Sequence, residues 1–292
     1  MSFIPELLTT VNTQVDQYTF EGYNAVVSLF STTLTTLLVI YFATLGWLVI
    51  RGLIPLTPMA VAWHMIKAAF VFAFALHWDY FSFFFVDFFV HGTDKLIGAV
   101  LSHNKHPGSV TTITTLLSNV WESGNNLFAG IWRASGTDFF LGTLMGFIGY
   151  GTITGITAIA LFYIIMSKIA LSVLLVLAPV ILPLYLWQPT RSIFNGWIQL
   201  LVQWMITPLL LYAFLGLFIG SVQTQITQMT SMTGGPTTAS ISAFALLGII
   251  IMATFKQAGT MARNLSQKIE IGSETSPGES VPALAFKALK NK

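Results

Sequence analysis

The chain has 292 residues, of which 54% are apolar and only 8% are charged, with a formal net charge of +2 and no cysteine. A soluble domain carries about 25% charged residues, so this composition excludes a water-soluble globular protein and indicates a membrane protein. The lack of cysteine excludes disulfide frameworks, thiolate nucleophiles and cysteine-ligated metals.

Residues 1–25 form a polar, Thr-rich N-terminal segment that contains no Lys or Arg. This segment lacks the basic region of a cleavable signal peptide, so we expect the apolar stretch that follows it to be retained. No charged residue lies between Gly22 and Ile50, and about 20 apolar residues suffice to cross a bilayer as a helix. The run does not alternate apolar and polar residues as a barrel strand would, so we expect a first membrane helix over residues 26–50.

A second membrane helix is expected over residues 68–90, which are rich in Phe and carry Asp79. An ionisable side chain at membrane depth costs about 2.5–3.5 kcal/mol and therefore usually faces a bundle interior or water. Asp79 is therefore a candidate intramembrane functional residue. The alternative is a neutral carboxyl group that is hydrogen-bonded inside the bundle, for example to His77 or Tyr80.

The end of this second helix carries Asp87, followed by His91 and Lys95 at intervals of four residues. These three side chains would share one helix face near the outer membrane surface, with Asp87 as a second intramembrane ionisable candidate. Residues 91–138 form a central loop in which apolar residues recur at helical spacing from Ile113 to Trp132. Such an amphipathic stretch lies on a membrane surface or packs on a partner.

A third membrane helix is expected over residues 139–166, and its glycines recur at small-xxx-small spacing. Small residues let membrane helices approach closely, so these glycines are candidates for helix packing within or between subunits. The alternative is that they reflect only the higher frequency of Gly in membrane helices. The candidate packing residues are Gly142, Gly146, Gly151 and Gly155.

The next apolar segment, residues 169–187, contains Pro179 and Pro183 one helical turn apart. Proline lacks the N–H that closes a helical turn, so Pro179 frees the carbonyl of Leu175 and Pro183 frees that of Pro179. Freed carbonyls are tolerated at membrane depth only where protein or a wet cavity satisfies them. We therefore expect a re-entrant hairpin over residues 169–196, with a kinked sixth spanning helix as the alternative.

Two further membrane helices are expected over residues 197–219 and 239–255, so that residues 139–255 form a C-terminal membrane bundle. Residues 256–292 form a basic tail that mixes Ser, Pro, Gly and Glu, and we expect it to be partly disordered. All predicted elements are helical. The fold class is therefore all-α, a polytopic membrane protein with five spanning helices and one proline-broken segment.

The positive-inside rule constrains the topology, because Lys and Arg gather on the cytoplasmic side. Two arrangements place most of the thirteen Lys and Arg residues there. One has five spanning helices and a re-entrant proline segment, with the N-terminus outside and the C-terminus inside. The other has six spanning helices and both termini inside. The chemistry of the prolines favours the first arrangement.

At the proline segment the chain resembles a known family, on the stretch LSVLLVLAPVILPLYLWQPTRSIFNGWIQLLVQWMITPLLLYAFLGLF, residues 171–218. The family is the polytopic inner-membrane subunit of type IV secretion and conjugation systems, the sixth VirB-type protein with its TrbL-like relatives. The residues that carry this resemblance are also the candidate channel or assembly motif. They are Pro179, Pro183, Arg191, Phe194, Trp197 and Pro208.

The resemblance implies a multi-pass protein of the bacterial inner membrane, with its N-terminal segment and central loop in the periplasm and its tail in the cytoplasm. It implies oligomers that work with the scaffold, pilus-tip and ATPase components of a secretion system to move DNA or protein and to assemble a pilus. No enzymatic activity, cofactor or metal is expected of the chain itself. The alternative is a stand-alone small-molecule or ion transporter or channel.

Overall fold

The computed structural model describes residues 3–51, 58–93, 95–96, 113–134, 139–231 and 238–269. Every regular element in these ranges is helical, and no strand occurs among them, so the predicted all-α architecture is confirmed. In chain order the elements are α1 (Phe3–Ile50), α2 (Pro58–Leu76), α3 (Trp78–Phe81), the π-helix η1 (Ser82–His91), α5 (Ile113–Ala134), α6 (Phe139–Val176), α7 (Ala178–Ile181), the 3₁₀-helices η2 (Leu182–Leu186) and η3 (Gln188–Thr190), α8 (Arg191–Ser231) and α9 (Thr238–Ser266).

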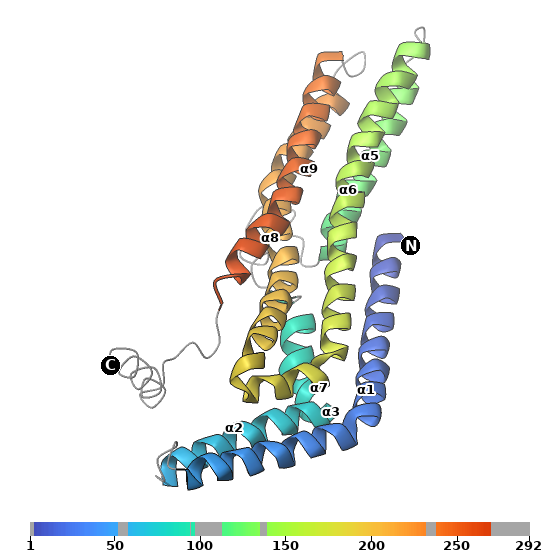
Figure 1. The fold of residues 1–292 in the computed structure, drawn as a ribbon. Helices are drawn as coiled ribbons and strands as arrows, with labels where there is room; N and C mark the ends of the chain where they lie inside the picture. Colours follow the sequence, from blue (N-terminus) through green and yellow to red (C-terminus); the bar gives the residue numbers. More distant parts are fainter. Residues whose placement is uncertain are drawn as a thin grey trace, which may run out of the picture.

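A bundle of long helices forms the main body of the molecule. In Figure 1, α6, α8 and α9 run side by side, and α5 lies along the first part of α6. Four helices, α1, α6, α8 and α9, are long and apolar enough to cross a membrane, and a bent pair around His77 makes a possible fifth span. The chain is therefore a multi-pass helical membrane protein by length and composition, as the sequence predicts.

A helical hairpin lies across one end of this bundle. Helix α1 bends, so that its first part runs beside α6 and its second part pairs with α2 across the end of the bundle (Figure 1). The chain then turns back along the bundle, because Val61–Leu76 and Trp78–His91 meet at an angle of 99°. The single helix expected over residues 68–90 is therefore broken at His77.

Two expected boundaries, at the N-terminal segment and at the last helix, differ from the structure. The polar N-terminal segment is not separate from the first membrane helix, because α1 is continuous from Phe3 to Ile50. The C-terminal membrane helix does not end at residue 255, since α9 continues to Ser266. The remainder of the tail, residues 270–292, lies outside the described residues.

The amphipathic stretch of the central loop packs on the chain itself. It forms α5, whose Leu117 and Val120 are buried against Ile153 of α6. The same core includes Ile4 at the start of α1 and Met229 near the end of α8. The first turns of α1, helix α5 and the last part of α8 therefore all contribute to one apolar core.

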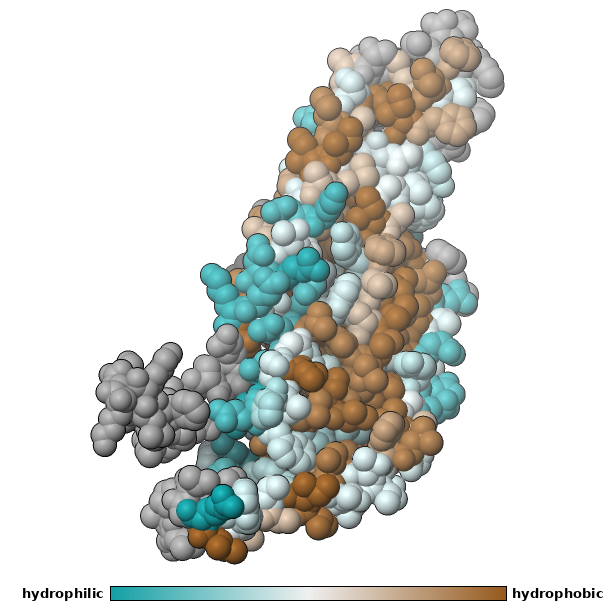
Figure 2. All heavy atoms as spheres, viewed as in Figure 1, coloured by the Kyte–Doolittle hydropathy of each residue, from teal (hydrophilic) through white to brown (hydrophobic). Residues whose placement is uncertain are grey.

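Most of the outer surface is apolar. Figure 2 shows apolar residues over much of one face, and hydrophilic residues over the last part of α9, where Lys256, Arg263 and Lys268 are exposed. Phe140 of α6 and Leu217 of α8 are 83% and 74% exposed. Exposed side chains of this size are expected on a surface that faces lipid rather than water.

Candidate functional site

The proline segment turns the chain between two antiparallel helices. Helix α6 ends at Val176, two short helical pieces follow, and Trp187 adopts an extended conformation before α8 begins at Arg191. Pro179 and Pro183 are both buried at the starts of the short pieces. The segment therefore makes a compact hairpin between α6 and α8, and the choice between a re-entrant segment and a kinked spanning helix stays a prediction.

Three side chains at or just before the start of α8 donate hydrogen bonds to carbonyl groups of this hairpin. The indole Nε1 of Trp197 donates a hydrogen bond to the Leu174 carbonyl in the last turn of α6, at 2.9 Å. The last four carbonyls of any helix lack a partner inside the helix, so this bond closes an end that would otherwise be open. The sequence predicted a freed carbonyl at Leu175, and the structure places the cap one residue earlier.

Two further groups close the turn itself. The hydroxyl of Thr190 donates to the carbonyl of Leu184 at 2.7 Å. The Nε of Arg191 donates to the carbonyl of Tyr185 at 3.3 Å, and the guanidinium lies 5.6 Å from the centroid of the Tyr185 ring. Arg191 therefore holds the hairpin together, beyond any contribution to membrane orientation.

Phe194 and Trp197 pack the hairpin from the side of α8. The Phe194 ring lies 4.9 Å from that of Tyr185 and 5.9 Å from that of Trp197, between ring centroids. Both side chains are more than 90% buried. Five of the six residues of the predicted motif thus meet in one place.

The sixth residue, Pro208, does not belong to this hairpin. It lies inside α8, where it is buried and lines a small cavity with Lys168 and Tyr212. Its ring removes one bond of the α8 ladder, because proline has no N–H to donate to the carbonyl four residues back. Pro208 therefore marks a separate local irregularity in the bundle.

A second helix break, which the sequence did not predict, occurs at His77. His77 has extended backbone angles, and in an uninterrupted helix the N–H of Trp78 would bond to the Phe74 carbonyl. Here the Tyr23 hydroxyl donates to that carbonyl at 2.8 Å. Tyr23 is completely buried, so a side chain of α1 caps this break as Trp197 caps the end of α6.

A stack of aromatic rings joins the two breaks. Tyr23 stacks on Phe81 with ring centroids 4.6 Å apart, and Phe81 stacks on Phe85 at 5.2 Å. Phe85 lies 6.1 Å from Trp197, the cap of the other break. Rings at these separations attract each other by about 0.5–1.5 kcal/mol per pair beyond their buried area. We call Tyr23, Phe81, Phe85 and Trp197 the aromatic column.

The local form of the helix fits this column. Residues Ser82–His91 form a π-helix, a rare conformation that is frequent at functional sites. Phe85 also stacks on Phe89, at 6.2 Å, so the rings along this element lie nearly parallel. The π-helix and the proline hairpin therefore share one aromatic core.

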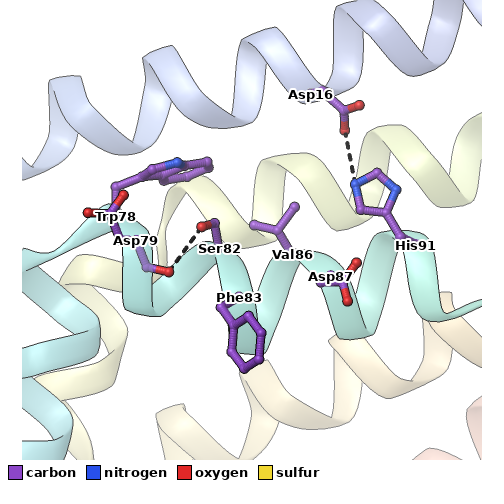
Figure 3. A pocket seen from close by; sticks show the side chains of 8 residues that line it. All are labelled: Asp16, Trp78, Asp79, Ser82, Phe83, Val86, Asp87 and His91. Atoms are coloured by element: carbon purple, nitrogen blue, oxygen red, sulfur yellow. Dashed lines mark hydrogen bonds and ion pairs between the residues drawn. The ribbon is translucent and has the colours of Figure 1, made fainter.

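The predicted intramembrane acids line an open pocket on the other side of the π-helix. The pocket holds about 490 Å³ and is shown in Figure 3; its lining residues are Asp16, Trp78, Asp79, Ser82, Phe83, Val86, Asp87 and His91. Asp79 is exposed here, and no bond joins its carboxylate to His77 or Tyr80 among the contacts of the described residues. The hydrogen bond to His77 or Tyr80 that the sequence allowed is therefore not formed among the described residues.

The charged residues at the end of the π-helix pair differently from the prediction. Lys95 binds both carboxylate oxygens of Asp87 at 3.0 Å. His91 instead faces Asp16 of α1, with 4.0 Å between His91 Nε2 and the Asp16 carboxylate. Asp87 and Lys95 therefore pair with each other, whereas His91 pairs with a residue of α1.

The glycines of α6 have different environments. A Cβ on Gly155 would lie 3.1 Å from the Met252 sulfur of α9, so this glycine permits close helix packing. Gly151 is exposed, and no heavy atom lies within 4 Å of a Cβ placed there, whereas Gly142 is half-buried and Gly146 is buried. The packing role thus holds for Gly155 and does not hold for Gly151 within this chain.

Glycine contacts tighter than that of Gly155 lie on neighbouring helices, which the spacing of α6 could not reveal. A Cβ on Gly248 of α9 would clash with the methyl group of Thr152. A Cβ on Gly22 of α1 would lie 2.7 Å from a methyl group of Val176. Both partners are β-branched and stiff, so these two contacts leave little room for adjustment.

Comparison with known proteins places these features in a family. A family model described as TrbL/VirB6 plasmid conjugal transfer protein matches residues 38–258, which include the proline hairpin, both helix breaks and most of α9. Tyr23 and the first part of α1 lie before the matched region.

Curated relatives of the chain come from Rickettsia. Uncharacterised proteins of Rickettsia conorii and Rickettsia felis are each 27% identical to it, over 190 and 188 residues and 61% of this chain. The chain spans about a fifth of the length of these relatives, since the matched part is 20% of each. The family model covers most of the chain on its own, and the chain therefore belongs to the TrbL/VirB6 family of conjugal transfer proteins.

Proposed function

We propose that the chain is a channel or assembly component in the inner membrane of a bacterium, within a type IV secretion machine. Membership of a conjugal transfer family supports a part in such a machine. In this role the chain takes part in moving DNA or protein and in pilus assembly, and it has no catalytic activity of its own. Its partners are further copies of itself and the scaffold, pilus-tip and ATPase components.

The main support for this proposal is that a side chain from another helix caps each helix break. One carbonyl at each break accepts a hydrogen bond from a distant side chain: the Phe74 carbonyl from Tyr23 and the Leu174 carbonyl from Trp197. A broken helix that binds a transported solute keeps its free backbone groups directed at the binding site. Capped breaks instead make a firm junction between helices, which suits a subunit that holds its place in a larger assembly.

A stand-alone transporter is the second candidate, and one observation favours it. Such transporters carry broken helices in corresponding positions of two halves. The sequence shows no counterpart of the proline segment in the first half, yet the structure has a break there, at His77. The caps on both breaks argue against this reading, and flux measurements separate the two.

Deletion and complementation test the proposal in the organism that encodes the chain. We expect deletion to abolish conjugal transfer or secretion, and the full chain, expressed in trans, to restore it. Affinity purification of the complemented protein in mild detergent should recover other secretion components. The proposal fails if transfer is unaffected by deletion and the purified protein alone moves a small solute or ion across liposome membranes.

A further inference from the structure

We infer that the α1–α2 hairpin carries a binding site for the head group of an anionic phospholipid. The site consists of two pairs, each an exposed Trp with a basic residue one helical turn later. The guanidinium of Arg51 lies 4.2 Å from the ring centroid of Trp47, and the ammonium of Lys67 lies 5.5 Å from that of Trp63. We call these four residues the Trp–cation pairs.

Both pairs are exposed, and a contact joins the two helices that carry them. Trp47 and Trp63 are 54% and 56% exposed, although both are large and apolar. The hydroxyl of Tyr41 on α1 lies 3.1 Å from Nδ1 of His64 on α2, which joins the two helices beside Trp63. Exposed Met59 and Ile50, at 80% and 85%, add apolar surface around the pairs.

The charge of the hairpin favours an anionic ligand. Residues 26–76 contain no Asp or Glu, and Arg51 and Lys67 are their two Lys or Arg residues. Neither cation has a carboxylate partner among the described residues, in contrast to Lys95, which is neutralised by Asp87. A ring face positions a cation without cancelling its charge, so both remain available to a phosphate.

The chemistry of the pairs identifies the ligand as lipid. Trp side chains favour the head-group level of a membrane, and guanidinium and ammonium groups bind phosphate there. Basic residues next to a membrane segment attract anionic lipid of the cytoplasmic leaflet. The expected topology places the connection between α1 and α2 on that side. The inference goes beyond the proposed function and does not depend on it.

Spin-labelled lipids test the site directly. The full chain is reconstituted in phosphatidylcholine vesicles at low salt, and electron paramagnetic resonance gives the association of spin-labelled phosphatidylglycerol relative to spin-labelled phosphatidylcholine. The variant R51Q/K67Q removes both cations. We expect it to lose about fivefold or more of the preference for phosphatidylglycerol, from the typical contribution of a basic residue near a membrane.

Two controls make the outcome decisive. The variant K256Q/R263Q removes the same charge from α9, and R51K/K67R keeps the charge of the site; both should retain the preference of the wild-type chain. The inference is overturned if R51Q/K67Q keeps that preference, or if K256Q/R263Q loses it equally, since the effect would then be one of net charge. It is also overturned if a DNA duplex displaces the spin-labelled phosphatidylglycerol from the wild-type protein.

Discussion

Replacement of Trp197 by Phe should destabilise the fold by removing the cap on α6. The substitution keeps an aromatic ring in the column but leaves the carbonyl of Leu174 without its donor. Interhelical hydrogen bonds in membranes contribute about 0.6 kcal/mol on average, with a maximum of about 1.7 kcal/mol. A carbonyl left unpaired in a buried site costs about 1–3 kcal/mol. Because Trp197 is only 3% exposed, we expect a loss of about 1–2 kcal/mol.

The free energy of unfolding is measured by titration with a denaturing detergent in mixed micelles. Trp204→Phe is the matched control, because Trp204 lies on the same helix, packs against the same core and has no hydrogen bond from its indole among the described contacts. Subtracting the loss of stability of Trp204→Phe from that of Trp197→Phe removes the part of the loss that comes only from replacing Trp with a smaller ring. A difference below about 0.5 kcal/mol would refute the role of Trp197 as a cap, since it lies within the usual effect of a neutral substitution.

Three further predictions use the same chain. Tyr23→Phe should lower the free energy of unfolding by about 0.6–1.7 kcal/mol, because the Phe74 carbonyl loses its donor; equal stability of Tyr23→Phe and the exposed control Tyr18→Phe would contradict this. Gly248→Val should cost about 1–3 kcal/mol through overpacking against α6, whereas Gly151→Val, measured alongside it, should be nearly neutral in the open space around that residue. The chain has no cysteine, so single cysteines can be introduced one at a time and treated with a membrane-impermeant thiol reagent. We expect the reagent to label three of four tested positions from the periplasm. Labelling of position 115 from the cytoplasm would overturn the expected topology. The three reactive positions are 12, 115 and 230, and the unreactive one is 189.

The proline hairpin could be predicted from sequence because its cause is local. Pro179 and Pro183 cannot donate to the helix ladder whatever surrounds them, so a break follows from their chemistry alone. Trp197 follows the polar turn after these prolines, and this position made it a candidate for the same site. Its bond to the Leu174 carbonyl is a tertiary contact, however, and no spacing rule indicates it.

The break at His77 could not be predicted for the opposite reason. No proline or glycine lies between Lys67 and His91, and the run reads as one apolar helix. The break is stabilised by Tyr23, more than fifty residues earlier in the chain and within a segment that the sequence assigns to a polar N-terminus. The glycines of α6 show that sequence spacing alone cannot identify a tertiary contact. The spacing marks both Gly151 and Gly155 as packing candidates, but only the structure shows that Gly155, and not Gly151, faces another helix.

The lengths of α6 and α8 determine how far the chain reaches. Their 38 and 41 residues correspond to about 57 and 62 Å at a rise of about 1.5 Å per residue. The hydrocarbon layer of a bilayer is about 30 Å thick, and even a tilt of about 40° would leave α6 more than 40 Å tall. Part of this antiparallel pair must therefore project into the aqueous compartment as a stiff stalk. Such a stalk extends the surface of the chain beyond the lipid.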